Sequence, residues 1–121
     1  CVFISGTGSN LRALLDIKAP FRISLVVIQK STALGLKHAQ NFGVPYLILD
    51  SQINWKQLTL DLKKFGITHI FLSGFMKILP AEFVEEWGQR IFNIHPSLLP
   101  LYPGLKSIEK AYEEKAPLGV T

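Results

Sequence analysis

The chain has 121 residues, and because a domain commonly comprises about 100 to 200 residues, this length excludes two full domains. Hydrophobic residues make up 48% of the chain and charged residues 18%, a balance that supports one packed core and excludes intrinsic disorder. The single cysteine, Cys1, excludes an internal disulfide and a cysteine-based zinc site. We therefore expect one globular domain, residues 1–121, in a reducing cytoplasm.

Charge and hydropathy narrow the range of partners. The chain carries 13 Lys and Arg against 9 Asp and Glu, a net charge of +4, but the basic residues are dispersed among acidic ones. This pattern fits a solvated surface or a small anionic ligand better than nucleic acid. No apolar run reaches the roughly 18 residues of a membrane span, and no signal peptide pattern opens the chain. We expect neither a nucleic acid nor a membrane partner, and the oligomeric state stays open.

Five short apolar runs alternate with helical patterns along the chain. The runs cover residues 1–5, 23–28, 44–49, 67–72 and 90–94, and helical spacing follows at 11–15, 34–42, 53–65, 80–87 and 105–115. This alternation predicts an α/β domain with a largely parallel sheet and helices on both faces. In such sheets ligands bind beyond the carboxyl ends of the strands, so the loops after the first, fourth and fifth runs are the places to seek chemistry.

The first of these loops is the glycine turn Ser5-Gly6-Thr7-Gly8, followed by Ser9 and Asn10. Free N–H groups at a helix start, together with the Ser9 hydroxyl, make a cradle suited to a phosphate monoester. The dinucleotide fingerprint is excluded because Leu11 stands where that motif needs its third glycine. The alternative is a tight turn in which Ser9 or Asn10 caps the helix.

The second segment begins at the end of the fourth run and reads Leu72-Ser-Gly-Phe-Met-Lys-Ile-Leu79. Its large side chains outside a regular element are compatible with capping of the core. Because the neighbouring loops carry the other two motifs, the same residues are also compatible with the wall of a ligand site.

The third motif is Asn93-Ile94-His95-Pro96 at the end of the fifth run. Residues two apart in a strand share a face, so Asn93 and His95 are expected to point one way and Phe92 and Ile94 the other. Pro96 holds the preceding histidine in an extended conformation. The motif therefore predicts a rigidly placed pair, a catalytic base beside an oxyanion donor, and the alternative is a structural histidine.

Taken together, three segments resemble the phosphoribosylglycinamide formyltransferases, a family of formyltetrahydrofolate-dependent enzymes with a Rossmann-like fold. They are residues 4–10, residues 74–79 and the segment Asn93-Ile-His-Pro-Ser-Leu-Leu-Pro-Leu-Tyr-Pro-Gly104, in this order and spacing. The resemblance implies transfer of a formyl group from formyltetrahydrofolate to glycinamide ribonucleotide, in purine synthesis. The related methionyl-tRNA formyltransferases usually carry arginine where this chain has Pro103.

The resemblance also implies roles for individual residues. It assigns the substrate phosphate to Gly8, Ser9 and Asn10, and the folate pocket to Asn93 and the run Met76, Lys77, Ile78 and Leu79, largely through backbone groups. It makes His95 the catalytic acid, with Asn93 against the formyl group. It implies formyltetrahydrofolate as co-substrate and no metal.

The chain departs from the family pattern at three places. Ile28-Gln29 stands where many members have Ser-Asn, Lys77 replaces a frequent arginine, and Ser51 falls where some members have a folate-contacting arginine. The first two changes preserve the role of the position, whereas Ser51 leaves open one folate contact that the resemblance implies.

The resemblance places the family's catalytic aspartate just past the segment that matches Gly119-Val120-Thr121. We therefore expect this chain to be a formyltransferase domain incomplete at its C-terminus, and residues 1–121 alone to be catalytically incompetent. Among its own acids, only Asp50 follows a predicted strand at the right end of the sheet. Two alternatives to the transferase stay open: a formyltetrahydrofolate hydrolase or other folate-dependent formyltransferase, and a catalytically silent phosphate-binding domain.

Overall fold

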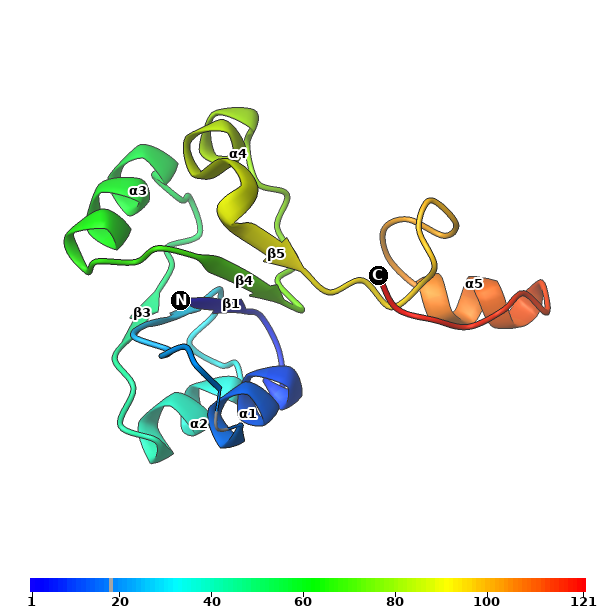
Figure 1. The fold of residues 1–121 in the computed structure, drawn as a ribbon, viewed down its shortest axis with the longest axis horizontal. Helices are drawn as coiled ribbons and strands as arrows, with labels where there is room; N and C mark the ends of the chain where they lie inside the picture. The colour runs from blue at the N-terminus through cyan, green and yellow to red at the C-terminus, as the bar shows by residue number, and fades with distance from the viewer. Residues whose placement is uncertain (18) are drawn as a thin grey trace.

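The computed structural model describes residues 1–17 and 19–121 (Figure 1). Strands and helices alternate from the N-terminus onward, as the hydrophobic pattern predicts. The elements are β1 Val2–Ile4, α1 Ser9–Asp16, β2 Val26–Ile28, α2 Gly35–Asn41, β3 Tyr46–Ile48, α3 Trp55–Lys64, β4 Ile70–Ser73, α4 Ala81–Trp87, the short 3₁₀ helix η1 Gly88–Arg90, β5 Ile91–Asn93 and α5 Ser107–Glu113.

The strands form one parallel sheet in the order β3-β2-β1-β4-β5. The chain runs outward from β1 to β3 and then returns to place β4 on the other side of β1. In a parallel sheet this reversal opens a crevice between the loops that leave the two strands. The loops after β1 and β4 are therefore held next to each other at the carboxyl edge of the sheet.

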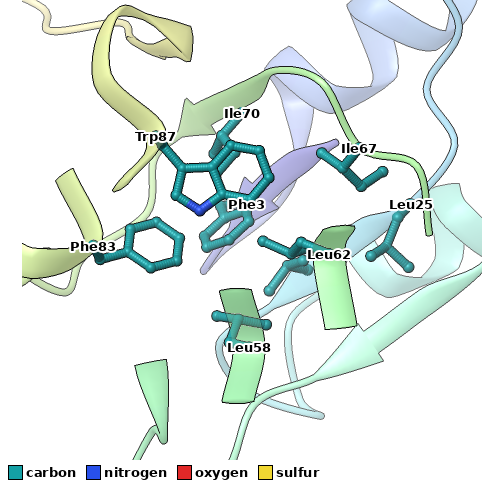
Figure 2. Packing of buried hydrophobic residues seen from close by; sticks show 9 residues of the cluster. Phe3, Leu25, Leu58, Leu62, Ile67, Ile70, Phe83 and Trp87 are labelled. Atoms are coloured by element: carbon teal, nitrogen blue, oxygen red, sulfur yellow. The ribbon is translucent and has the colours of Figure 1, made fainter. Parts of the chain in front are cut away.

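Helices cover both faces of the sheet, with α1 and α2 on one side and α3 and α4 on the other (Figure 1). This arrangement confirms the predicted α/β architecture. On the α3 and α4 side, Leu58 and Leu62 stand four residues apart on α3, so both reach the sheet and pack near Phe3 (Figure 2). Phe83 and Trp87, again four apart, do the same from α4. On the opposite face Leu11 and Ala39 pack against β1 and β2.

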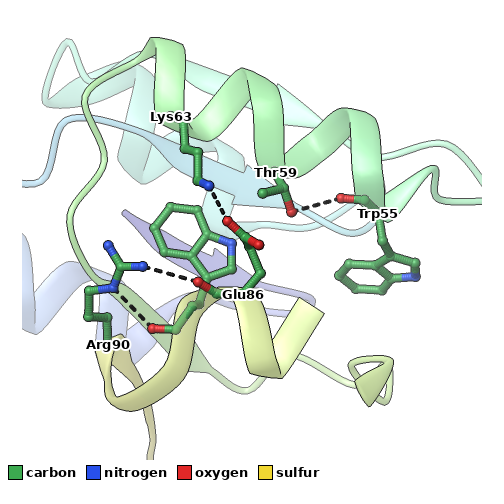
Figure 3. Close-up of polar contacts among 6 residues, drawn as sticks. Trp55, Thr59, Lys63, Glu86 and Arg90 are labelled. Carbon is green, nitrogen blue, oxygen red and sulfur yellow. Dashed lines mark hydrogen bonds and ion pairs between the residues drawn. The ribbon is translucent and has the colours of Figure 1, made fainter. Parts of the chain in front are cut away.

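Polar contacts join α3 to α4 and hold the end of α4 (Figure 3). Lys63 of α3 forms an ion pair with Glu86 of α4. The Arg90 guanidinium donates to the carbonyl oxygens of Glu86 and Trp87, at 3.1 and 3.0 Å. Because the last carbonyls of a helix have no intrahelical partner, Arg90 closes α4 directly before β5 begins.

The helices begin within two residues of their predicted starts, and two of these starts change how the helix is capped. Helix α4 begins at Ala81, with Pro80 as an extended N-cap residue rather than as the first helical residue. Helix α1 begins at Ser9 with Gly8 as its N-cap residue, and no side chain caps it. The expectation that Ser9 or Asn10 serves as a helix cap is therefore wrong, because both already lie inside the helix. Helix α5 and the final residues lie beyond the carboxyl end of β5, to the side of the sheet (Figure 1).

Candidate active site

The glycine turn, residues 5–8, leads β1 directly into α1. Gly8 has φ 75°, and an added Cβ there would lie 2.7 Å from the Cα of Gly35 at the start of α2. Only glycine combines this left-handed backbone with so close an approach. The first intrahelical bond runs from Arg12 N–H to the Gly8 carbonyl, at 2.8 Å. The preceding N–H groups at the start of α1 are therefore available to a ligand.

A cavity of about 130 Å³, here called the small cavity, opens at this helix start. Gly8, Ser9 and Asn10 all line it, so the three residues predicted to hold a phosphate share one site. Helix α1 has no acidic residue in its first turn that would repel an anion. The remaining lining residues are Gly6, Thr7, Ser73 and Gly74.

Ser73 belongs to the segment considered as a ligand wall, but sequence reasoning gave this serine no role of its own, and it lines the small cavity. It ends β4, pairs in register with Ile4 and is 6% exposed. Within the described part of the chain its hydroxyl is buried without a hydrogen-bond partner. The available signal was its position, since a serine closing a buried apolar strand usually needs a partner.

The loop after β4, residues 74–79, directs some of its large side chains toward the core and others outward. Phe75 packs edge-on against Phe3, with ring centroids 5.2 Å apart, and Leu79 also contacts the core. Met76 and Ile78 are instead turned outward, and Ile78 is 94% exposed. Side chains that cap the core and side chains that face outward therefore alternate along one loop.

Two hydrogen bonds anchor the 74–79 loop to the rest of the sheet edge. The Met76 N–H donates to the Ser5 hydroxyl at 2.9 Å. The Lys77 ammonium donates to the carbonyl oxygen of Ser51, at 3.0 Å, in the loop after β3. Ser51 therefore meets Lys77 through its backbone, although its side chain lacks the charge of an arginine.

A larger cavity of about 740 Å³ lies between the 74–79 loop and the segment that leaves β5. Both members of the predicted polar pair, Asn93 and His95, line it together with all four predicted folate residues. Gly74 lines both cavities, so the two meet at this glycine. The full lining set is Leu72, Gly74, Phe75, Met76, Lys77, Ile78, Leu79, Asn93, Ile94, His95, Pro96, Gly104, Leu105, Lys106, Ser107, Ile108 and Glu109.

The predicted alternation of faces holds for only part of this segment. Phe92 lies on the opposite face, where its ring stacks on Phe71 with centroids 5.2 Å apart. Ile94, however, lines the same cavity as Asn93 and His95, so its expected placement is wrong. The physical reason is that β5 ends at Asn93, and strand periodicity does not extend beyond a strand.

His95 is held by both its backbone and its ring. Its N–H and carbonyl pair with those of Thr121, at 2.8 and 2.9 Å, which keeps the backbone extended. Its Nε2 lies 2.9 Å from the Tyr102 carbonyl oxygen. Because a carbonyl oxygen only accepts, Nε2 carries a proton and Nδ1 is the ring nitrogen left for a ligand.

A serine supports the acceptor of this bond. The Ser97 hydroxyl, on a residue only 3% exposed, donates to the carbonyl oxygens of Leu101 and Tyr102 at 2.7 and 3.2 Å. Tyr102 has φ 52°, a left-handed conformation, and its own hydroxyl donates to Glu114 at 2.7 Å. Fixed polar partners therefore determine where the imidazole of His95 lies.

The positions of two acids, Asp50 and Glu109, bear on the search for a carboxylate near His95. Asp50 lines a separate cavity between β3 and α3, together with Asn54 and Asp61, and not the cavity of His95. Glu109, in the first turn of α5, is the carboxylate that lines the large cavity in the described chain. Across residues 1–17 and 19–121, no three His, Cys, Asp or Glu side chains are grouped to hold a metal ion. Nor does this part of the chain contain a helix long and apolar enough to cross a membrane.

Comparison with known proteins places this geometry in a family. The formyl transferase model matches residues 1–121. The chain is 37% identical to phosphoribosylglycinamide formyltransferase of Escherichia coli, over 93% of this chain and 58% of that protein. It is 42% identical to the trifunctional purine biosynthetic protein adenosine-3 of Drosophila melanogaster, over 93% of this chain and 9% of that protein.

Solved structures agree in fold as well as in sequence. Phosphoribosylglycinamide formyltransferase from Anaplasma phagocytophilum superposes with a TM-score of 0.93 at 38% identity, covering 99% of this chain and 60% of that structure. The chain therefore spans about three fifths of the length of the Escherichia coli and Anaplasma phagocytophilum proteins. On the match of the family model along residues 1–121, this chain belongs to the formyl transferase family.

Proposed function

We propose that the protein transfers a formyl group from formyltetrahydrofolate to the amine of glycinamide ribonucleotide. The observation that carries the proposal is the meeting of two unlike cavities at Gly74. One is lined by the turn and first residues of a helix, the other by an amide and an imidazole beside an apolar wall. The relatives named as phosphoribosylglycinamide formyltransferases support the same reaction.

The two substrates divide between the cavities. The phosphate of glycinamide ribonucleotide binds at Gly8, Ser9 and Asn10, where N–H donors and the helix dipole favour an anion. Formyltetrahydrofolate occupies the large cavity against residues 76–79, with Asn93 at its formyl end. Because the Met76 N–H is engaged by Ser5, backbone donation to the folate falls to Lys77, Ile78 and Leu79.

The reaction is an attack of the substrate amine on the formyl carbon. A new carbon–nitrogen bond forms, and the carbonyl oxygen becomes an oxyanion that accepts hydrogen bonds from the Asn93 amide and from protonated His95 through Nδ1. The bond between the formyl carbon and the folate nitrogen then breaks. The amine loses one proton and the departing folate nitrogen gains one, with His95 shuttling the proton between them.

The proposed partners are these two small molecules, and the proposed location is the cytoplasm. Dispersed basic residues and a single cysteine support both statements.

The test is to incubate the protein in its natural full-length form with formyltetrahydrofolate, with and without glycinamide ribonucleotide. Formylated ribonucleotide is followed by mass spectrometry, and tetrahydrofolate by absorbance. We expect both products to form in equal amounts and only when the ribonucleotide is present. Release of formate without it would indicate a hydrolase, and binding of both ligands without turnover would indicate a silent domain.

A further inference from the structure

Three loops that leave adjacent strands are tied together by one cluster of hydrogen bonds. The Ser5 hydroxyl, just after β1, donates to Oε1 of Gln29, just after β2. The Met76 N–H, in the loop after β4, donates to the Ser5 hydroxyl and also lies 3.3 Å from the same Gln29 oxygen. The Gln29 backbone is itself fixed, because its N–H donates to the Ile4 carbonyl at 2.9 Å.

Members of this cluster adjoin both cavities along the chain. Ser5 directly precedes Gly6, which lines the small cavity. Met76 lies two residues past Gly74, the residue that lines both cavities, and itself lines the large one. The Gln29 oxygen therefore links Ser5, which precedes the proposed phosphate site, to Met76 in the proposed folate loop. Gln29 itself lines neither cavity.

The distance between the glycine turn after β1 and the loop after β4 matters for the proposed reaction. An amine held through its phosphate and a formyl group held through its folate react only when nitrogen and carbon come within about 3 to 3.5 Å. An error of about 1 Å in that placement costs on the order of 10² in rate. Other contacts also hold each loop, but the hydrogen bonds of this cluster join the loops directly.

We infer that Gln29 is a positioning residue for formyl transfer, acting through Oε1 on Ser5 and on the Met76 N–H. This inference rests on the proposed function. It assigns the effect to the acceptor oxygen of the side chain, because the structure shows Oε1 and not Nε2 in these bonds.

Two substitutions separate the acceptor from the bulk of the side chain. Gln29→Met keeps the length of the side chain and removes the acceptor. Gln29→Glu keeps an acceptor oxygen at the same reach and replaces only the amide nitrogen. In the natural full-length protein, we expect Gln29→Met to lower kcat by about 10-fold to 100-fold, more than it raises either KM.

Gln29→Glu should retain kcat within about threefold of the parent protein. Its negative charge near the phosphate site should instead raise KM for glycinamide ribonucleotide, and added salt should reduce that effect. The matched control is Gln40→Met on the exposed side of α2, which should leave kcat and both KM values unchanged.

A readout without substrate tests the anchor directly. Hydrogen exchange of the Met76 amide should be slow in the parent protein and in Gln29→Glu, and faster in Gln29→Met. Ser5→Ala, which removes the other acceptor of this N–H, should speed exchange and lower kcat in the same way. The Ser5→Ala variant also tests the inference if Gln29→Met fails to fold.

An unchanged kcat in folded Gln29→Met, or an equal loss of kcat in Gln29→Met and Gln29→Glu, would overturn the inference. A parent protein without formyl transfer would instead contradict the proposed function. In that case, an equal rate of hydrogen exchange at the Met76 amide in the parent protein and all variants would also overturn the role of Gln29 in anchoring the loop.

Discussion

The main chain of Tyr102 orients the imidazole of His95. The Nε2–H group of His95 donates a hydrogen bond to the Tyr102 carbonyl oxygen, and the two heavy atoms lie 2.9 Å apart. The same carbonyl accepts a second hydrogen bond from Ser97. Because this acceptor is a main-chain carbonyl oxygen, a substitution of the Tyr102 side chain does not remove it. It selects the tautomer of the neutral ring and leaves Nδ1 for the substrate.

His95 and Asn93 should act on one transition state. In the natural full-length protein, His95→Ala should lower kcat by on the order of 10² to 10⁴ as loss of a general acid. Asn93→Ala should lower it by on the order of 10² to 10³ as loss of an oxyanion donor. The double variant should lose less than the product of the two, measured by steady-state kinetics.

The control for this pair is His69→Ala, because His69 is exposed and lines neither substrate cavity. Its kcat should equal that of the parent protein. A folded His95→Ala protein with nearly normal turnover would remove His95 from the mechanism.

Gly8 should be essential to the fold as well as to phosphate binding. In Gly8→Ala the new Cβ would lie 2.7 Å from the Gly35 backbone, and the left-handed φ of 75° alone costs about 1 to 3 kcal/mol in a residue other than glycine. We expect a clear fall in Tm, measured by thermal unfolding. Gly6→Ala is the matched comparison, since a Cβ at Gly6 meets no atom within 4 Å. Equal Tm values for the two variants would contradict this account of the turn.

The Lys63–Glu86 ion pair should make stability depend on acid pH. The hydrogen bond from Lys63, and then its charge, hold the pKa of Glu86 below its ordinary value of 4.5. A lowered folded-state pKa contributes stability above the unfolded value, and that contribution disappears as the pH falls from about 4.5 through the folded value. Glu86→Gln should therefore lower Tm slightly at neutral pH and not at all at the acid end of the range.

Because both side chains are about half exposed, the effect should be small and should shrink in high salt. Thermal melts at several pH values, with Glu85→Gln as control, measure it. A Glu86→Gln deficit that persists unchanged in acid would exclude the ion pair as its cause.

Asp50 should not take part in the chemistry. It lines the cavity between β3 and α3, whereas His95 lines the one beyond β5. Asp50→Asn should therefore keep kcat within about threefold of the parent protein, since a substitution outside the reacting groups removes no transition-state interaction. A loss comparable to that of His95→Ala would show that Asp50 reaches the histidine in the working enzyme.

Much of the fold could be predicted from local patterns. Alternating apolar runs and helical spacing place all five strands and the helices between them, because each element needs one apolar face or a fully apolar run. The glycine turn between the first apolar run and the first helical pattern also predicts that Gly8, Ser9 and Asn10 lie at a helix start. Asn93 and His95, two residues apart, likewise share a cavity as predicted.

What the sequence by itself could not determine depends on residues far apart in the chain. Strand β5 ends at Asn93, so Ile94 lines the same cavity as its two neighbours, and no residue type at that position signals the end of the strand. The cluster of Ser5, Gln29 and Met76 joins positions 24 and 47 residues apart, brought together only by the strand order β2-β1-β4. Sequence periodicity reports which face of an element is apolar, whereas a hydrogen bond between two loops depends on how the strands are ordered, which only the packed tertiary structure decides.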